Sequence, residues 1–291
     1  MPALAIRNAS SKAVLLPTVV VMIVCFYGSI LWTIYISFTR SGMLPSYSLQ
    51  GVAQYVRLFH TARWHTAFAN MFIFGGLYIV AAIVLGTLLA ILMDQQIRLE
   101  SVFRTIFLYP LAMSFIVTGL AWQWFLNPTM GLQHFVRSLG WESFTFNWIV
   151  DRNYAIYTLV FAAIWHGTGL IMAIMLAGLR GIDSEIWRAV RVEGIPRWRA
   201  YLRIVIPMLR PLMVTCVVLL AIDVVKSYDL VIAMTKGGPG TSTDLPAKFV
   251  VDMSFERANI GLASAGAVIM LIVVLAAVGP YLYFELGRKN R

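Results

Sequence analysis

The stretch GIDSEIWRAVRVEGIPRWRAYLRIVIPMLRP, residues 181–211, decides how the rest of this chain is interpreted. It is rich in arginine and lies between two long apolar runs that must each cross a bilayer. A simple turn between two membrane spans needs only a few residues, yet this segment has apolar residues at helical spacing throughout. Two interpretations remain open from the residues alone: a docking element for another protein, or an amphipathic loop held by anionic lipid.

The composition places the whole chain in a membrane. Hydrophobic residues make up 60% of the 291 residues and charged residues 12%, and the mean hydropathy is +0.79. A soluble domain carries about 25% charged residues. Apolar runs of about 20 residues, each long enough to cross a ~30 Å hydrocarbon core, recur along the sequence. We therefore expect an all-α membrane protein with six transmembrane helices, at about 14–38, 68–93, 103–125, 154–179, 212–234 and 262–284.

The distribution of Lys and Arg predicts the orientation. Counting the connections alternately, the N-terminal tail, the 94–104 turn, the 180–211 loop and the C-terminus share one side and carry fourteen basic residues. The other side carries eight, spread over longer loops. By the positive-inside rule, the first side is cytoplasmic, with both termini inside. The net charge of +10 thus reflects topology, and no basic–aromatic module indicates a nucleic-acid partner.

A single compact membrane domain is expected. Its predicted limits are 14–284, with a cytoplasmic tail at 1–13 and a basic cytoplasmic tail at 285–291. The first apolar run is too long for a signal peptide and is read as a retained span. Cys25 and Cys216 both fall inside apolar runs, so a disulfide framework is not expected.

The segment 181–211 has its own start and stop signals. Asp183 or Ser184 can cap a short helix whose first turn holds Glu185. Gly194 and Pro196 end that helix, and a second short helix follows. The sequence therefore predicts a helix–turn–helix that lies along the membrane surface.

This segment resembles the EAA loop of ABC-importer permeases. Gly194, Ile204, Pro207 and Pro211 match that pattern in identity and spacing, and Ala189 matches one of its alanines. The resemblance favours docking over lipid contact. It implies that an ATPase subunit docks on residues of this loop, namely Glu185, Arg188, Ala189, Arg191, Glu193 and Gly194.

Two further motifs extend the resemblance along the chain. FLNPTMGL at 125–132 resembles an external loop of sugar permeases. MTKGGPGTSTD at 234–244 resembles the external loop before the last span of the first permease of a sugar-importer pair. Taken in six-span order, the three motifs indicate similarity to one half of a heterodimeric, maltose-type (carbohydrate-uptake) ABC permease.

The chain departs from the EAA pattern at one important position. Arg188 stands where the family has a glutamate that pairs with a basic residue of the ATPase, and Val190 replaces the second alanine. An arginine cannot make that ion pair. Glu185, one turn earlier, or Glu193, where the family usually has aspartate, is the expected substitute.

The resemblance also implies partners. It implies a second homologous permease, two ATPase subunits that bind ATP and Mg, and an extracytoplasmic sugar-binding protein, all in or at a bacterial inner membrane. The external loops 40–67, 126–153 and 235–261 are expected to receive the sugar, a monosaccharide or simple derivative. This chain itself is expected to hold no cofactor and not to be an enzyme, because GGPG at 237–240 lacks the GxxxxGK[ST] pattern of a P-loop.

Polar residues inside the fourth and fifth apolar runs are candidates for the sugar pathway. Ionisable groups at membrane depth are costly and usually face a bundle interior or a water-filled path. Asp223 and Lys226 are spaced to pair with one another, which leaves a purely structural, self-neutralised pair as the second interpretation. The candidate pathway residues are His166, Gly167, Asp223, Lys226, Ser227, Tyr228 and Asp229.

Two other classes of protein remain as alternatives. An ion-coupled secondary transporter would use Asp223, Lys226 and Asp229 as ion sites, but the paired broken-helix repeats of such folds are not evident. A membrane-embedded enzyme is disfavoured because the chain lacks GxSxG and HExxH motifs. No second histidine stands at metal-ligand spacing from His166, so no metal site is predicted.

Overall fold

The computed structural model describes residues 16–95 and 97–289. Within these ranges the chain forms helices and turns and no β-strand, apart from one isolated bridge between Thr39 and Leu49. The expectation of an all-helical chain is confirmed for this part. The described residues form two compact units: unit 1 contains residues up to Thr61 and Phe249–Leu271, and unit 2 contains Ala62–Lys248 and the residues from Ile272 onward.

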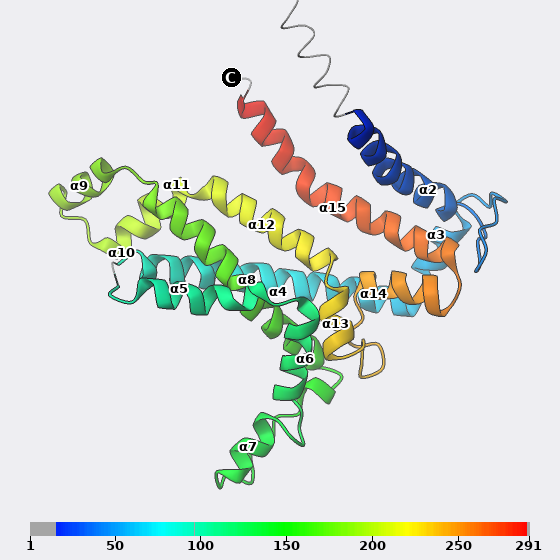
Figure 1. Ribbon diagram of the computed structural model, residues 1–291, viewed down its shortest axis with the longest axis horizontal. Helices are drawn as coiled ribbons and strands as arrows, with labels where there is room; N and C mark the ends of the chain where they lie inside the picture. The colour runs from blue at the N-terminus through cyan, green and yellow to red at the C-terminus, as the bar shows by residue number, and fades with distance from the viewer. Residues whose placement is uncertain (1–15, 96, 290–291) are drawn as a thin grey trace, which may run out of the picture. The chain divides into compact units, whose positions relative to one another are not determined.

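Unit 2 contains most of the helices (Figure 1). They are α4 (Ala62–Met93), α5 (Glu100–Leu108), η2 (Tyr109–Ala112), α6 (Phe115–Phe125), α7 (Leu132–Ser138), η3 (Trp148–Val150), α8 (Ala155–Arg180), α9 (Ser184–Val192), α10 (Arg197–Ala200), η4 (Tyr201–Val205), α11 (Ile206–Met208), α12 (Arg210–Val225) and α13 (Tyr228–Met234). Unit 1 contains η1 (Ile23–Tyr27), α2 (Gly28–Ser37), α3 (Ala53–Phe59) and η5 (Asp252–Glu256). The helices α14 (Pro246–Val251) and α15 (Ile260–Lys289) contribute to both units.

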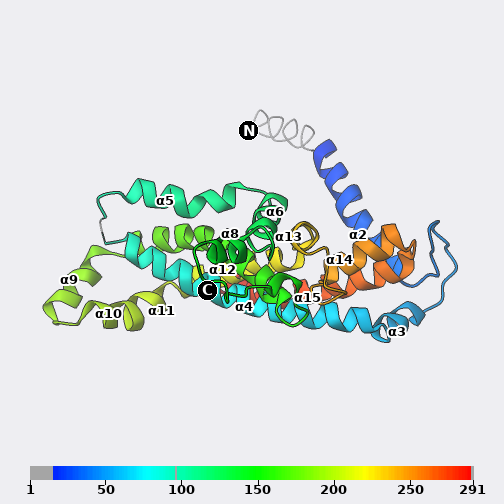
Figure 2. The ribbon, with the colours of Figure 1, turned by 90° about the horizontal axis from the view of Figure 1, so that it is seen from below.

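The core of unit 2 is the contact between α4 and α8, which lie side by side in Figures 1 and 2. Each helix buries a stripe of residues four apart, and small residues recur along both stripes. Small side chains let two helix backbones approach closely, which is how helices associate when lipid removes the hydrophobic driving force between them. The stripe of α4 is Phe74, Tyr78, Ala82, Gly86 and Ala90, and that of α8 is Ala163, Gly167, Ile171, Met175 and Leu179.

The two central helices run parallel. Gly167 lies against the Tyr78 ring, and further along both helices Gly86 lies against Ile171. At the C-terminal ends, Arg180 Nε lies 4.0 Å from Asp94 Oδ1, directly after α4. The segment after α4 and the segment after α8 therefore lie at the same end of unit 2.

The connections of unit 2 gather at two opposite ends. Helices α9–α11 lie where α8 ends and α12 begins, while α6, α7 and α13 lie toward the other end (Figure 1). Near the N-terminal end of α4, the Asn70 side chain donates hydrogen bonds to the carbonyls of Ser242, at 2.8 Å, and Asp244, at 3.0 Å. This separation agrees with the alternation of connections expected from the sequence.

Two of the expected spans are not single straight helices. The third run bends by 100° between η2 and α6, and the fifth is interrupted between Val225 and Tyr228. A further bend of 69° lies between α11 and α12, directly before the fifth run. Pro110 and the β-region Ser114, which accepts a hydrogen bond from Val117 N, account for the first bend. Pro211 in the first turn of α12 marks the second.

Three helices in the described part are long and apolar enough to cross a membrane, and five candidate spans result if each bent pair counts as one. The three are Leu16–Ser37, Ala62–Met93 and Ala155–Arg180. In addition, Ile260–Ala276 is a shorter apolar helix. The six-span count and the positions of both termini stay predictions.

Unit 1 is held by buried polar groups at the turn that follows α2. The Gln54 amide donates to Thr39 O at 2.9 Å, and Gly261 N donates to Ser41 O at 2.9 Å. The helix α3 lies within the segment 40–67, which the sequence predicts to be an external loop. Both cysteines are free, as expected, with Cys216 buried and Cys25 exposed.

The closest approach in unit 2 yields a stability prediction. A Cβ on Gly169 of α8 would lie 2.1 Å from the Phe107 carbonyl oxygen, whereas one on Gly76 of α4 would meet nothing within 4 Å. Gly169→Ala should therefore cost about 1–3 kcal/mol through overpacking. Gly76→Ala should be neutral or slightly stabilising, because alanine is the better helix former. Size-exclusion chromatography of the detergent-solubilised protein after heating measures both, and equal midpoints for the two variants would contradict this packing.

Candidate functional site

The segment 181–211 forms the predicted helix–turn–helix. Asp183 caps α9 by accepting a hydrogen bond from Glu185 N at 2.9 Å. Gly194 ends it in the left-handed region at φ +64°, with Ile195 N donating to Val190 O at 3.1 Å. This is a Schellman motif, in which glycine avoids the strain that a Cβ would bring. The sequence prediction of a bend at Gly194 is confirmed.

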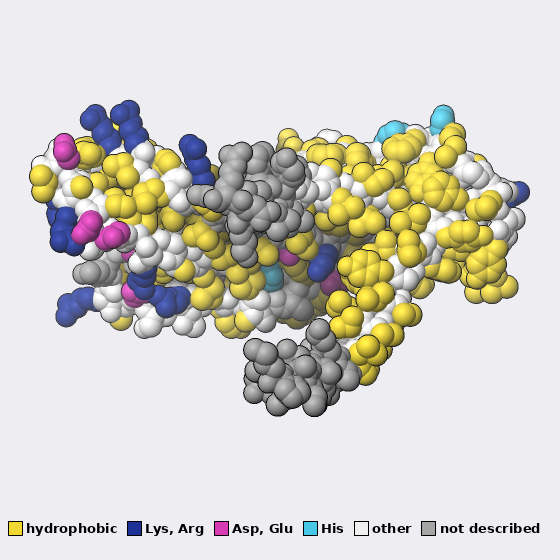
Figure 3. Space-filling view, turned by 90° about the horizontal axis from the view of Figure 1, so that it is seen from above, with side chains coloured by type: hydrophobic (Ala, Val, Ile, Leu, Met, Phe, Trp, Pro, Cys, Tyr) yellow, Lys and Arg dark blue, Asp and Glu magenta, His cyan; other side chains and the backbone are white. Residues whose placement is uncertain are grey.

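The helix α9 has one inner and one outer face. Val190 is buried on the inner face, where the Trp187 ring packs edge-on against the Tyr201 ring with centroids 5.3 Å apart. All six candidate docking residues are exposed: Glu185, Arg188, Ala189, Arg191, Glu193 and Gly194. Figure 3 shows the Lys and Arg side chains gathered at this end of unit 2. The structure thus brings these six residues together on one open surface.

Arg188 makes only weak contacts within the chain. Its guanidinium donates to Ser184 Oγ at 3.2 Å and lies 4.0 Å from the Glu185 carboxylate. The side chains of Arg188 and Glu185 are 63% and 77% exposed, so this i,i+3 pair contributes little to stability. Arg188 is therefore free to contact a partner.

Tyr201 ties the inner side of the loop to the end of α4. Its hydroxyl accepts a hydrogen bond from the Gln95 amide at 3.0 Å and donates to Asp94 Oδ2 at 3.5 Å. Arg197 also donates to Gln95 Oε1 at 3.2 Å. Because Tyr201 packs against Trp187 as well, one aromatic side chain contacts both α9 and the segment directly after α4.

A second tie joins α8 to α5 at the same end. Arg180, the last residue of α8, donates to Glu100 Oε1 at 2.8 Å, and Arg104 pairs with the same carboxylate. The three side chains are partly exposed, so each pair alone contributes little to stability. We call Asp94, Gln95, Glu100, Arg104, Arg180, Arg197 and Tyr201 together the polar clasp.

The candidate pathway residues lie in three different places. Gly167 and Asp223 both lie near Tyr78: a Cβ on Gly167 would be 2.2 Å from the Tyr78 hydroxyl, and Asp223 interacts electrostatically with Tyr78 and Lys226. His166 instead faces α6, with Nδ1 3.3 Å from Thr118 Oγ1. In the part of the chain that the structure describes, no ion pair joins Asp223 to Lys226.

The remaining pathway candidates lie around a break in the fifth run. Helix α12 ends at Val225, and α13 starts at Tyr228. Lys226 and Asp229 are exposed, whereas Ser227 is buried and donates to Val224 O at 2.6 Å. The sequence predicted a continuous helix here. The break places Tyr228 and Asp229 on a separate short helix, away from the α12 residue Asp223.

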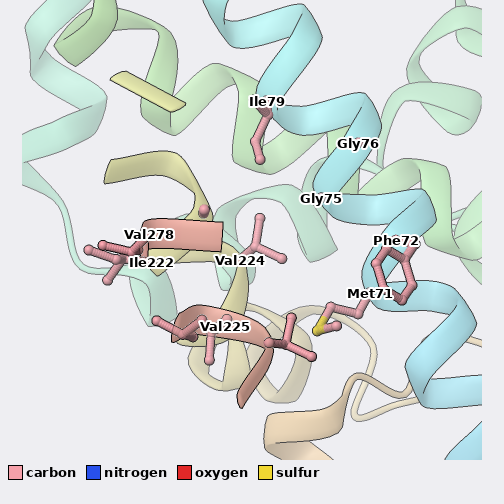
Figure 4. A pocket seen from close by; sticks show the side chains of 12 residues that line it. Met71, Phe72, Gly75, Gly76, Ile79, Ile222, Val224, Val225 and Val278 are labelled. Carbon is pink, nitrogen blue, oxygen red and sulfur yellow. The ribbon is translucent and has the colours of Figure 1, made fainter. Parts of the chain in front are cut away.

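An apolar cavity of ≈ 210 Å³ lies beside this region, between α4, α12 and the unit 2 part of α15. Met71, Phe72, Gly75, Ile222 and Val224 are among the side chains that line it (Figure 4). It offers no side-chain hydrogen-bonding group, and a polyhydroxylated ligand needs several. This cavity is therefore not suited to a sugar. Within residues 16–95 and 97–289, no cluster of metal-ligating side chains is found.

At the opposite end, the motif 234–244 is anchored to the start of α4. Arg63 pairs with Asp244, whose side chain is 1% exposed. Lys248 Nζ lies 3.7 Å from the other carboxylate oxygen. Removing one member of such a buried pair leaves an uncompensated charge, so the motif is firmly held. The residues GGPG at 237–240 lie in a loop of turns and bends.

Comparison with known proteins decides the family. The model of the family "Binding-protein-dependent transport system inner membrane component" matches residues 82–289. This chain belongs to that family. The permease is 36% identical, over 95% of its own length and 96% of the relative's, to a probable ABC transporter permease protein of Pyrococcus horikoshii.

Two further similarities support the assignment of the permease. It is 31% identical to the xylose/arabinose import permease protein of Haloferax volcanii, over 91% of this chain and 84% of that one. Its fold matches a chain of a bacterial alginate ABC transporter crystallised with an alginate pentasaccharide-bound periplasmic protein. That match has a TM-score of 0.81 at 20% identity and covers 94% and 92% of the two chains. The resemblance to ABC-importer permeases is thereby confirmed.

Sequence reasoning missed the polar clasp of the permease and the position of Tyr78. No local sequence pattern links Asp94, Glu100 and Arg180, because these residues belong to three segments that meet only in the fold. Tyr78 is an aromatic residue in an apolar run, and only the small Gly167 facing it reveals a close contact. A tyrosine hydroxyl usually finds a hydrogen-bond partner when its ring is buried, and this is the one signal in the sequence that could have indicated a role for Tyr78.

The left-handed conformation of Gly194 yields a prediction for the loop. A Cβ there would meet nothing within 4 Å, so the constraint on this residue is its backbone angle alone. Gly194→Val should cost at least about 1–2 kcal/mol and loosen the turn, whereas Gly194→Asn should be tolerated. Limited trypsin digestion of the purified permease, which cleaves at the arginines flanking the turn, should be faster for the valine variant. Equal digestion of both variants would contradict a turn held by this angle.

Proposed function

We propose that the permease carries a sugar into the cytoplasm, as one subunit of an importer whose ATP is hydrolysed by separate subunits. The observation that carries this proposal is the exposed α9 surface, fixed from behind by the polar clasp, in a member of a binding-protein-dependent transport family. The xylose/arabinose relative supports a monosaccharide or simple derivative as cargo.

The topology that we propose has six spans with both termini in the cytoplasm. Its membrane domain runs over 14–284, between short tails at 1–13 and 285–291. The two opposite ends of unit 2 support it, because the arginine-rich loop and the 94–104 segment share an end. The positive-inside rule then makes that end cytoplasmic. Two relatives come from archaea, so the proposal is a cell membrane, bacterial or archaeal.

The proposed assembly has this permease beside a second, homologous permease. Two ATPase subunits that bind ATP and Mg dock from the cytoplasm, one of them on the α9 surface. An external sugar-binding protein meets the opposite end of unit 2. Pushing on α9 would move Trp187 and Tyr201 and thus the end of α4, so that the spans alternate between outward and inward access.

The pathway proposal centres on Tyr78 and Asp223, beside Gly167. A tyrosine hydroxyl, a carboxylate and a nearby ammonium offer hydrogen bonds to a polyhydroxylated ligand. The Tyr78 hydroxyl is buried and interacts with the Asp223 carboxylate, and a bound ligand or water would complete the hydrogen bonds of both groups. An ion-coupled carrier would use the same groups, but the family match does not favour it.

Reconstitution tests the function directly. The permease is inserted into liposomes with its second permease, its ATPases and its binding protein, and labelled xylose, arabinose, glucose and maltose are supplied outside. We expect uptake that requires internal ATP and favours the monosaccharides. Uptake driven by a sodium or proton gradient without ATP would overturn the proposal, and a preference for maltose would replace the monosaccharide part of it.

Arg188 stands where the family has a glutamate that pairs with a basic residue of the ATPase. We therefore expect the docked ATPase to carry an acidic residue opposite Arg188. Arg188→Glu should weaken assembly with the ATPase, and an acid-to-base change on the ATPase should restore it. A double-mutant cycle should give a coupling energy of about 0.5–3 kcal/mol. Arg98→Glu changes an exposed charge in the 94–104 turn and serves as the control. Absence of coupling would mean that Arg188 makes no contact with the ATPase.

A double variant of Asp223 and Lys226 distinguishes a role in the sugar pathway from a purely structural pairing of the two residues. The double variant Asp223→Asn with Lys226→Met removes both charges at once, so it leaves no uncompensated ion. It should assemble normally, as judged by size-exclusion chromatography, yet lose uptake or change sugar preference. Unchanged uptake rates and preference at matched expression would assign the two residues a purely structural role.

A further inference from the structure

A polar cavity lies at the end of unit 2 opposite the docking helix. It has a volume of ≈ 360 Å³ and is formed where α6 and α13 end. The motifs at 125–132 and 234–244, which lie far apart in the sequence, both contribute to it. Its polar lining includes Gln123, Asn127 and Lys236. Small-molecule sites typically measure about 300–1,000 Å³, so a single sugar unit is of suitable size.

Lys236 is held in a conformation that lysine rarely adopts. Its φ is +53°, and Ala258 is the only other non-glycine residue with positive φ among those described. Its backbone N–H donates to Val231 O at 2.8 Å and so ends α13. Glycine or asparagine is the usual residue at such a position. Glycine would adopt this backbone angle with less strain than lysine, so the lysine at position 236 indicates a function for its side chain.

Two polar side chains of the cavity lining, Lys236 and Gln123, have no partner within the described residues. The Lys236 ammonium makes no ion pair there, and the half-buried Gln123 amide makes no hydrogen bond there. Pro128, Ile149 and Pro239 add apolar surface to the same cavity. Lys236 is exposed and Gln123 is half-buried, so both side chains are free to donate to a ligand. Donors beside flat apolar surface match a sugar, which presents oxygens at its edge and C–H groups on its face.

The frame around these groups is fixed. Asn127 Oδ1 accepts from Thr129 N at 2.9 Å and from Thr129 Oγ1 at 2.7 Å. On the other loop, Thr243 Oγ1 lies 2.7 Å from Thr235 Oγ1 and donates to Gly238 O at 2.9 Å. Both loops are therefore held by hydrogen bonds of their own, which lowers the entropy cost of binding a ligand.

We propose that this cavity is the first sugar-binding subsite of the permease, contacted by Gln123 and Lys236, and that it binds a sugar with a carboxylate more tightly than its neutral counterpart. This proposal rests on the function proposed above. Lys236 is the one charged side chain in the cavity lining, so the ligand group beside it is best an anion. A single acidic side chain of a docking protein would leave most of the cavity unfilled.

The test uses the complete importer in lipid nanodiscs, without ATP, and two probes: glucuronate and glucose. Saturation-transfer NMR measures sugar binding, and surface plasmon resonance measures binding of the sugar-free external binding protein. The decisive variant is Lys236→Gly, because glycine accepts the backbone angle and removes only the side chain. Arg152→Met, an exposed cation outside the cavity lining, is the matched control.

We expect Lys236→Gly to be at least as heat-stable as the wild type while its affinity for glucuronate falls about tenfold, the loss of one charge-assisted hydrogen bond. Gln123→Leu should weaken glucuronate and glucose alike, and Arg152→Met should change neither.

Three results would overturn the proposal: no sugar signal from the wild type, equal affinities in the wild type and Lys236→Gly, or loss of binding-protein affinity in Lys236→Gly with sugar binding intact. The last would assign the cavity to an acidic side chain of the binding protein. Failure of ATP-driven uptake by the wild type, with sugar binding at Lys236 retained, would instead contradict only the importer function.

Discussion

The close, parallel packing of α4 against α8 is the constraint on which unit 2 depends. Both helices bury stripes that include alanine and glycine, and the contact of Gly86 with Ile171 shows how near the backbones come. In lipid there is little hydrophobic gain from bringing helices together, so dispersion between well-fitted surfaces must supply it. The parallel direction then places the segments after α4 and after α8 at one end, and the arginine-rich loop must emerge there.

The polar clasp connects the segments that meet at this end of unit 2. Tyr201 contacts Trp187 on α9 and is hydrogen-bonded to Gln95 beyond α4, so the amphipathic loop is fixed from behind while its charged face stays open. No single interaction of the clasp is strong. Its members join four segments at one place, and through them α9 is connected to the ends of both central helices.

Much of this arrangement was predictable from local sequence signals. The cap at Asp183, the bend at Gly194 and the turn at 237–240 each follow from the chemistry of a few neighbouring residues, and the structure has all three. The break after Val225 was missed although Lys226 and Ser227 interrupt the apolar run there, because no proline or glycine marks the end of the helix. The pairing of Glu100 with Arg180 and of Tyr201 with Gln95 was also missed, since it depends on which ends of helices meet.

The central claim is that the exposed face of α9 lies in the cytoplasm and is covered by an ATPase. A single cysteine at Arg188, in a chain whose Cys25 and Cys216 are replaced by serine, tests both parts with a membrane-impermeant maleimide. The account predicts labelling in inside-out vesicles stripped of ATPase, little labelling in right-side-out vesicles, and protection when the ATPase is restored. Labelling from the outside, or labelling that the ATPase leaves unchanged, would contradict it.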